Sequence, residues 1–499
     1  MRLIQHSFFS KKSFLFLCLL GACCVLGTTS KAQYRTRSGG NWASSSNWEY
    51  LELGAWYPAI VAPGPSSGDI YIQPGHTITV NSARSIHRLH VGGVLEMQAG
   101  GSVNITNQSA VPGELEVQPG GVLRSTGANF YSNEIIYGSG SQIHILSNGK
   151  ITVGSGGPVA GTDLHGYASN GSNIWEDGAR FEWNSSSVLP GSGVTFFPGI
   201  AANVKPLLIV SNSGAYIGGA LPTTINGKLE VENTFTLSGA GAKYIRDGIT
   251  GSGLLTVEPG SGDIILDGPA PILGGRNLRI VADDYFYIPN GLTIPTDSSV
   301  SLVAFAGSVF TGKGTNHFTV NGTIDMGLVT IENPAGAVNI NGVFKTAHPG
   351  GLEGGCITAN SVVNVNNNST VEYTAPGNQA VTGTNVLEGA GAYYNVFFSG
   401  TGIKSLAGPV NIINHLRISG TVIVDALLYN IGSPSTAFTM TGGRLQLGQG
   451  GLQPQMGGAY NITAGAVQFA KNGGAQLIRG GTGYQYHDIE IAGDQVGIA

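Results

Sequence analysis

The sequence predicts an all-β protein that winds into a single long parallel β-helix. Glycine is abundant, at 79 of 499 residues, and charged residues make up only 11% of the chain. The apolar content of 41% is nevertheless that of a folded protein, whereas disordered chains are poor in apolar residues and rich in charge. A short glycine-led strand phrase also recurs along the chain, and helical spacing of apolar residues is absent. Together these features indicate many short strands joined by tight turns.

Residues 1–32 have the features of an export signal. Arg2, Lys11 and Lys12 precede an apolar run over residues 13–27, and Ser30-Lys31-Ala32 fits a small-x-small cleavage site. A second interpretation takes Leu20-Gly21-Ala22-Cys23 as a lipobox with Cys23 lipidated. Either way we expect the protein to be secreted and extracellular, or associated with the outer-membrane surface. No later stretch approaches the ~20 apolar residues of a membrane-spanning helix.

The positions of the cysteines and the net charge limit the disulfides and the partners that the protein can have. Cys18, Cys23 and Cys24 lie in the signal, so Cys356 is the one cysteine expected in the mature chain, and it cannot form an intrachain disulfide. We expect it to be a buried small apolar residue, because no Cys-His signature surrounds it. Four of the 24 basic residues and none of the 29 acidic ones lie in residues 1–32, which leaves a formal charge near −9. Nucleic acid is therefore not an expected partner.

The repeated phrase is a glycine followed by alternating apolar and polar residues. Copies begin at Gly68, Gly93, Gly113, Gly149, Gly227, Gly253, Gly322, Gly342, Gly420, Gly443 and Gly465. Adjacent copies are 20 to 23 residues apart, which suggests one coil of a parallel β-helix per repeat. An array of β-sandwiches would instead show repeats near 80–100 residues. Coils of ~22 residues stacked ~4.8 Å apart would make a rod on the order of 100 Å long.

The copy GELEVQPGG, from Gly113, shows what each phrase should build. Alternation places Leu115 and Val117 inside the coil and Glu114 and Glu116 in solvent. Pro119-Gly120-Gly121 then turns the corner. Other corners carry Asn-Gly pairs that end at Gly227, Gly322 and Gly342, and we expect these to supply positive φ values.

A longer phrase overlays the first in the second half of the chain. It runs from Val204 and again from Tyr393, and reads strand, turn, short strand, then the glycine-led strand. A third copy starts at Tyr486 and stops at Ala499 before it is complete. A solenoid normally closes its last coil with a polar cap, so we expect the chain to be truncated at its C-terminal end.

Four stretches resemble proteins from one group of bacteria. SGGNWASSSNW from Ser38, PGPSSGDIYIQPGHTITV from Pro63 and GVLEMQAGG from Gly93 resemble the N-terminal opening of secreted Bacteroidetes surface proteins, and also the extracellular domain named for its eight glycines. YYNVFFSGTGIKSLAGPVNI, from Tyr393, is similar to the repeat of large adhesin-like proteins from the same bacteria. The resemblance implies a right-handed parallel β-helix and, for many such proteins, export by the type IX system.

Within that resemblance, residues 33–66 form an N-terminal cap and residues 67–499 form the repeats. Trp42 and Trp48 would pack over the first coil, because an uncovered sheet end invites aggregation. The alternative is that the two rings form a platform on which sugars stack.

Catalysis is the main alternative function, because β-helices also include pectate lyases and polygalacturonases. Asp283-Asp284 and Glu176-Asp177 are the best candidate acids, but adjacent residues on a strand point to opposite faces. The polygalacturonase pattern fails, since the only Gly-His is Gly75-His76 and no Arg-x-Lys follows. The acids lack the spacing of Ca²⁺ loops and the histidines lack that of zinc sites, so no cofactor or metal is expected.

The sequence therefore predicts an exported structural or adhesive β-helix that binds glycan or another surface without catalysis. The alternative is a carbohydrate-active enzyme, a polysaccharide lyase or glycoside hydrolase, on the same fold. Ligand contacts are expected where the repeat is interrupted, and the aromatic candidates there are Trp175, Trp183, Tyr285 and Tyr287.

Overall fold

The structure is a computed structural model of the chain. It describes residues 31–498 except for 109–110, 127–134, 154–172, 186–192, 259, 283–284, 305–308, 312–316, 333–335, 359–361, 388–390 and 495. The described residues fall into two compact units. The first comprises the chain to Leu123 together with 133–143, and the second comprises 124–132 and 144–499.

The first unit is built from coils of three short strands. Each strand pairs in parallel with the strand three places further along the chain, as in a parallel β-solenoid. The three sheets are β5 (Asp69–Ile72), β8 (Arg88–Val91) and β11 (Glu114–Val117); β6 (Thr77–Val80), β9 (Val94–Met97) and β12 (Val122–Ser125); and β7 (Ala83–Ile86), β10 (Ser102–Ile105) and β13 (Ile135–Tyr137).

Residues before β5 add antiparallel pairing. β1 (Tyr34–Thr36) pairs in parallel with β5 and antiparallel with β3 (Trp48–Glu52), which pairs antiparallel with β4 (Ala55–Pro58). β2 (Gly40–Asn41) pairs with β6, and a 3₁₀ turn, η1 (Ser45–Asn47), precedes β3. Trp42 and Trp48 are fully buried, with ring centroids 4.8 Å apart. Since both rings are buried, neither offers a face on which a sugar could stack.

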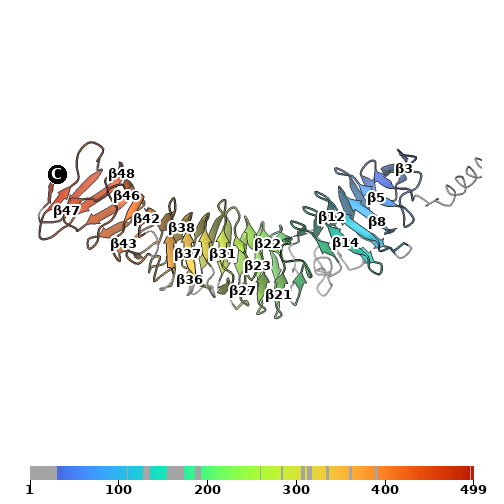
Figure 1. Ribbon diagram of the computed structural model, residues 1–499, viewed down its shortest axis with the longest axis horizontal. Helices are drawn as coiled ribbons and strands as arrows, with labels where there is room; N and C mark the ends of the chain where they lie inside the picture. Colours follow the sequence, from blue (N-terminus) through green and yellow to red (C-terminus); the bar gives the residue numbers. More distant parts are fainter. Residues whose placement is uncertain are drawn as a thin grey trace, which may run out of the picture. The chain divides into compact units, whose positions relative to one another are not determined.

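The second unit repeats the parallel pattern over many more coils (Figure 1). One sheet contains β15 (Lys150–Val153), β17 (Arg180–Trp183), β19 (Leu207–Val210), β22 (Lys228–Val231), β25 (Gly248–Gly251), β28 (Ile272–Leu273), β31 (Leu292–Ile294), β34 (Phe318–Val320), β37 (Ala337–Ile340) and β39 (Val362–Val365). A second contains β18 (Thr195–Phe196), β21 (Thr223–Ile225), β24 (Lys243–Ile245), β27 (Ile264–Ile265), β30 (Tyr285–Tyr287), β33 (Val309–Thr311) and β36 (Thr330–Glu332).

The third large sheet of this unit carries the groove described below. It contains β20 (Ala215–Ile217), β23 (Thr234–Leu237), β26 (Leu254–Val257), β29 (Leu278–Ala282), β32 (Ser299–Ala304), β35 (Thr323–Asp325), β38 (Val343–Thr346), β40 (Thr370–Tyr373), β42 (Tyr393–Phe398), β44 (Ile412–Ile418) and β46 (Ala437–Leu447). Beyond β46 it continues through β45 (Ile423–Ala426), β43 (Ile403–Leu406) and β41 (Gln379–Val381), and through β48 (Tyr460–Phe469) and β50 (Asp488–Ile491).

The remaining strands are short. β47 (Gly451–Gln453), β49 (Gln476–Ile478) and β51 (Val496–Ile498) form a parallel sheet of their own, and β14 (Gln142–Ile145) pairs with β16 (Ile174–Trp175). No helix among the described residues has the length and apolar character needed to cross a membrane.

The predicted inside–outside alternation is confirmed. Leu115 and Val117 have no exposed surface, while Glu114 and Glu116 are partly exposed. The same pattern recurs on most four-residue strands, so a continuous apolar core fills each stack of coils.

The prediction that each copy of the phrase makes one coil is only partly right. The copies from Gly322 and Gly342 form β35 and β38, which pair directly, with Thr323 opposite Val343. The copies from Gly93 and Gly113 are also 20 residues apart, yet they form β9 and β11, which belong to different sheets. The phrase therefore marks a strand between two turns, and any face of the coil can use it.

The role assigned to the Asn-Gly corners is also corrected. Gly120 has the expected positive φ, 78°, but Gly227, Gly322 and Gly342 do not. At Gly342 a Cβ atom would lie 2.1 Å from the carbonyl oxygen of Gly322 in the coil below, so glycine is needed there for close approach. The preceding asparagines form a ladder, in which Asn341 Nδ2 donates to Asn321 Oδ1 at 2.8 Å.

Candidate functional site

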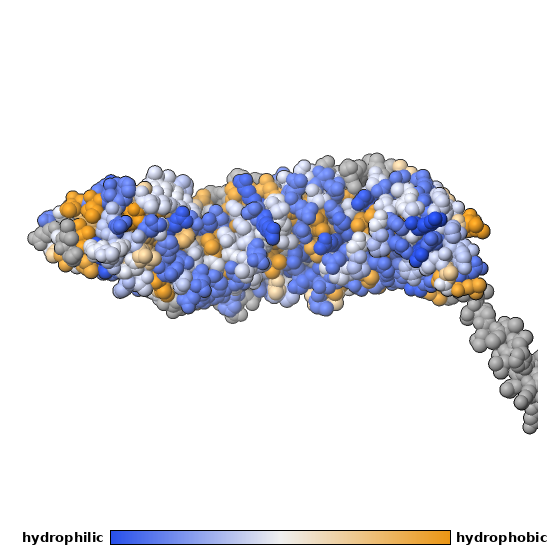
Figure 2. Space-filling view, turned by 90° about the horizontal axis from the view of Figure 1, so that it is seen from above, coloured by the Kyte–Doolittle hydropathy of each residue, from blue (hydrophilic) through white to orange (hydrophobic). Residues whose placement is uncertain are grey.

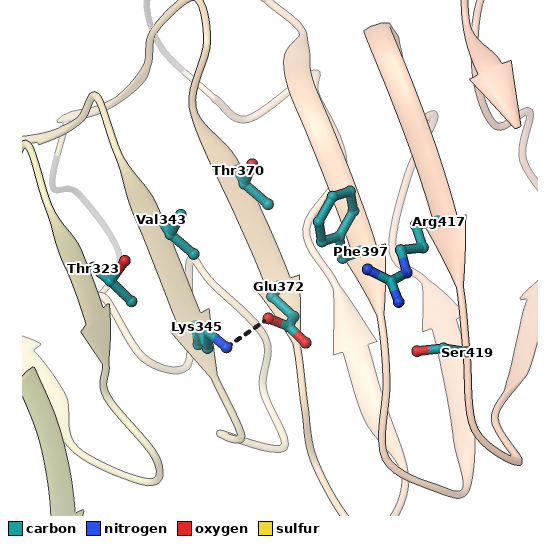
Figure 3. A pocket seen from close by; sticks show the side chains of 8 residues that line it. All are labelled: Thr323, Val343, Lys345, Thr370, Glu372, Phe397, Arg417 and Ser419. Atoms are coloured by element: carbon teal, nitrogen blue, oxygen red, sulfur yellow. Dashed lines mark ion pairs between the residues drawn. The ribbon is translucent and has the colours of Figure 1, made fainter. Parts of the chain in front are cut away.

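A shallow groove of about 400 Å³ lies on the outer face of β35, β38, β40, β42 and β44, five neighbouring parallel strands of the second unit. We call it the outer groove. It is lined by Thr323, Val343, Lys345, Thr370, Glu372, Phe397, Arg417 and Ser419 (Figure 3).

Strand register brings these side chains together. Lys345, Glu372, Phe397 and Arg417 are direct partners on successive strands and form one row across the sheet. A second row runs from Thr323 through Val343 and Thr370, two positions earlier on their strands. The residues between the rows point inward, and Phe344, Val371, Val396 and Leu416 are fully buried. The two-residue period thus places both rows on the outer face.

The row that contains Lys345 begins within the groove as an ion pair, and outside the groove Asp325 stands opposite Lys345 on β35. Lys345 Nζ lies 3.0 Å from Glu372 Oε2, and Ser399 Oγ donates to Glu372 Oε1 at 2.8 Å. Both oxygens of the Glu372 carboxylate are therefore engaged.

The other end of the row is a cation beside an aromatic ring. The Arg417 guanidinium carbon lies 5.7 Å from the centre of the Phe397 ring, and the His415 imidazole meets that ring edge-on at 5.8 Å. Figure 3 shows Phe397 and Arg417 next to each other on adjacent strands. Arg417 is exposed, and it makes no ion pair with any residue that the structure describes.

The neighbouring histidine adds no second cation at neutral pH. Burial, together with the nearby Arg417 charge, holds the pKa of His415 below its ordinary value. Its Nε2 lies 2.8 Å from Thr439 Oγ1. Arg417 is thus the cation that the row leaves available.

The outer groove has groups that suit ligand binding. It combines a ring, an unpaired cation, an ion pair and three hydroxyl groups, but only one of its lining residues is an acid. Glycoside hydrolysis needs two carboxyl groups ~5–10 Å apart. Within the described part of the chain, no three His, Cys, Asp or Glu side chains are grouped so that they could hold a metal ion.

A second charged surface lies on the first unit, and we call it the paired row. Arg88 stands opposite Asp69 and Glu114 on β5 and β11, with ion-pair distances of 3.4 and 4.0 Å. Beside it, His90 Nδ1 lies 3.0 Å from Glu116 Oε1, and its ring stacks on Tyr71 at 4.7 Å. Arg88 and His90 thus each face a carboxylate from a neighbouring coil.

The candidate acids Glu176 and Asp177 follow β16 and support turns. Glu176 Oε1 lies 3.1 Å from His144 Nε2, and its Oε2 accepts the backbone N–H of Ser147 at 3.1 Å. Asp177 is exposed, and its Oδ1 accepts the backbone N–H of Lys205 at 3.0 Å. The two carboxylates therefore have separate partners. Asp283 and Asp284 lie outside the described residues.

The structure gives no support to Trp175 and Trp183 as ligand contacts, because both are core residues. Trp175 is 3% exposed and its ring meets Phe197 edge-on at 4.8 Å, while Trp183 has no exposed surface. Large aromatic side chains on inward strand positions bury the most apolar area, which explains their placement. Tyr287 is partly exposed on β30, and the Tyr285 side chain lies outside the described part of the structure.

Cys356 is buried as expected. Its Sγ lies 3.3 Å from the carbonyl oxygen of Val329, and burial raises the pKa of its thiol to about 12. At neutral pH the group is therefore an uncharged thiol and a weak nucleophile.

Sequence reasoning missed the outer groove. Phe397 and Arg417 belong to the long phrase that begins at Tyr393, which predicts strands but not which polar residues meet. The available signal was the exposed aromatic at an outward strand position, with arginine 20 residues later at the equivalent position of the next coil.

Comparison with protein-family models, curated proteins and solved structures finds no match to this chain.

Proposed function

We propose that this protein is an exported, surface-associated β-solenoid that binds glycan and catalyses no reaction on it. The observation that carries the proposal is the outer groove, where an aromatic ring, a cation and hydroxyl groups gather around a fully engaged carboxylate. Rings stack on sugars, while hydroxyl and charged groups bind their substituents. Figure 2 shows mostly hydrophilic and neutral residues on its face, with hydrophobic residues scattered, as suits contact with a hydrated polymer.

The proposed location outside the cell rests on the sequence. Residues 1–32 carry a basic start, an apolar run and a small-residue cleavage site. The resemblance to secreted Bacteroidetes surface proteins supports export, with the type IX system as the route. In this proposal residues 33–66 cap the first coil. The burial of Trp42 and Trp48 against each other supports that role.

Glycan binding is tested with the full chain secreted from a Bacteroidetes host and a panel of immobilised neutral, uronic-acid and sulfated polysaccharides. We expect saturable binding to at least one member without release of reducing sugar. Absence of binding to the whole panel would refute the proposal. Turnover of any member would instead support the carbohydrate-active enzyme.

The export proposal has its own measurement. N-terminal sequencing of the surface fraction should yield a chain that begins at Gln33 if Ala32 ends the signal. A blocked, lipid-labelled N-terminus would instead support lipidation at Cys23, and an intact Met1 in the cytoplasm would refute export.

A further inference from the structure

We propose that the outer groove binds an acidic polysaccharide built from uronic acids, with the carboxylate of one sugar held by Arg417 and a sugar face packed on Phe397. This inference rests on the proposed glycan-binding function and adds to it a binding site and a ligand class.

Charge is the first reason. Among the lining residues, Lys345 and Glu372 neutralise each other across 3.0 Å and His415 is held toward its neutral form, so Arg417 is the charge of the lining that remains unbalanced. Asp325 is outside the lining and stands opposite Lys345 on β35, four strands from Arg417, whose own strand partners are Phe397 and Thr439. That local charge stands out on a chain whose formal total is −5. A guanidinium presents planar paired donors that match a carboxylate, and such charge-assisted bonds are stronger than neutral ones.

The ring is the second reason. Phe397 is partly exposed on a sheet where the inward aromatic of the same strand, Phe398, is buried. The phenyl ring contacts Arg417 and His415 and remains partly exposed, so it keeps apolar surface in contact with water, at a free-energy cost. The apolar face of a sugar ring would cover that surface.

The geometry of the strands is the third reason. Five parallel strands ~4.8 Å apart give the groove a length of about 19 Å along the stack of coils. One coil step is close to the length of one sugar unit in an extended chain. A polymer that follows the stack could therefore place successive sugars over successive strands, within reach of the partly exposed Thr323 and Ser419 hydroxyls.

A uronic-acid polymer suits this groove better than a densely sulfated one. Densely sulfated chains carry more than one charge on each sugar and are held by clusters of basic residues, whereas a polyuronate carries a single carboxylate on each sugar. The groove offers one unpaired cation, and Glu372 lies two strands from it in the same row. One carboxylate held by Arg417, with the carboxylates of adjacent sugars directed to solvent, matches that arrangement.

The test measures binding of the secreted full chain to polygalacturonate, dextran and dextran sulfate. We expect polygalacturonate to bind best, and Arg417→Gln to weaken that binding about tenfold, or ~1.4 kcal/mol. Arg417→Lys keeps the charge but loses the paired donors, so it should fall between Arg417→Gln and the unaltered protein. Arg279→Gln is the matched control, because Arg279 is exposed on β29 of the same sheet with Leu254 and Ser301 as strand partners. It should leave binding unchanged within about twofold.

The outcomes separate the inference from the proposed function. Binding that survives Arg417→Gln, or is lost equally with Arg279→Gln, would overturn the site while leaving glycan binding intact. Equal binding of dextran, or preference for dextran sulfate, would overturn the uronic-acid assignment. Failure to bind any polysaccharide in the wider panel would refute the proposed function as well. Circular dichroism of each variant confirms that the surface substitutions leave the fold intact.

Discussion

The paired row and the outer groove are the same kind of surface with different charge balance. Both stand on outward positions of neighbouring parallel strands above a fully buried apolar layer, with Leu89 beneath the first and Leu416 beneath the second. In the paired row Arg88 has carboxylates on both flanking strands. In the outer groove Phe397 occupies the position between Glu372 and Arg417 and keeps that acid and base apart.

If the outer groove binds glycan as proposed, few substitutions separate a structural surface of this solenoid from a binding one. Register fixes which side chains are neighbours, so the identity of one residue in a row decides whether a cation is neutralised. In the paired row the arginine is neutralised by neighbouring carboxylates and has little free charge to offer a ligand. In the outer groove Arg417 is not neutralised in this way, so its charge is free to attract one.

The largest expected effect comes from the layer that both rows share. Leu89→Ala and Leu416→Ala should each destabilise the protein by about 2–5 kcal/mol, through lost apolar burial and a residual cavity. Chemical denaturation followed by circular dichroism measures the change. Leu→Met at the same positions is the control and should cost less than ~1.5 kcal/mol. A near-zero effect at one site alone would show that the two rows do not rest on equivalent cores.

The next largest effect is expected from a substitution that gives Arg417 a carboxylate on the neighbouring strand. Phe397→Glu places a carboxylate directly opposite Arg417, removes the ring and adds negative charge beside Glu372. We expect polygalacturonate binding to weaken by roughly 30-fold, or ~2 kcal/mol. Phe397→Leu removes only the ring and should have a smaller effect. If the Phe397→Glu variant binds polygalacturonate as well as the unaltered protein does, the charge difference between the outer groove and the paired row has no role in binding.

Below the outer surface, a buried lysine gives a pH-dependent contribution to stability. Lys404 has no exposed surface, its Nζ donates to the carbonyl oxygens of Ala375 and Gly377, and burial lowers its pKa to about 8. Unfolded lysine has a pKa near ~10.4. Between these values the unfolded chain holds a proton that the folded chain has lost, so this residue adds stability as pH rises from about 8 to 10, on the order of 1–2 kcal/mol.

The measurement for Lys404 is the midpoint of denaturant unfolding at several pH values. Lys404→Met keeps the apolar stem and removes the titrating group, so its stability should rise less over this range. Identical slopes for the two proteins would contradict the assignment.

The smallest effect is expected in the paired row. Arg88→Gln breaks two ion pairs, but the Arg88 side chain is 44% exposed, so the loss should stay below ~1 kcal/mol and shrink in high salt. The same denaturation experiment tests it, with Arg279→Gln as a control for loss of a surface arginine. A loss above ~2 kcal/mol would mean that the row holds neighbouring coils together.

The fold could be predicted because its signals are local. Alternation at Leu115 and Val117 and the turn at Gly120 depend on neighbours in the chain, and the structure confirms them. The burial of the aromatic candidates could not be predicted from local signals. Trp175 and Trp183 are indistinguishable in sequence from surface aromatics, and only the direction in which each strand faces buries them.

The outer groove could not be predicted because its residues are set by register between coils of unequal length. Lys345 pairs with Glu372 across 27 residues and Glu372 with Phe397 across 25, whereas Phe397 and Arg417 are 20 apart. A search of the sequence for repeats of one fixed length therefore does not find these strand partners.

The sequence by itself therefore determined the all-β class, the alternation of apolar and polar residues and the parallel stacking of short strands, because each follows from local spacing and turn chemistry. The tertiary structure decided which copies of a phrase share a face, which aromatic rings are buried and which cations face a carboxylate on a neighbouring strand. Those properties depend on pairing between distant strands, and the loops that connect the strands set that pairing by their lengths.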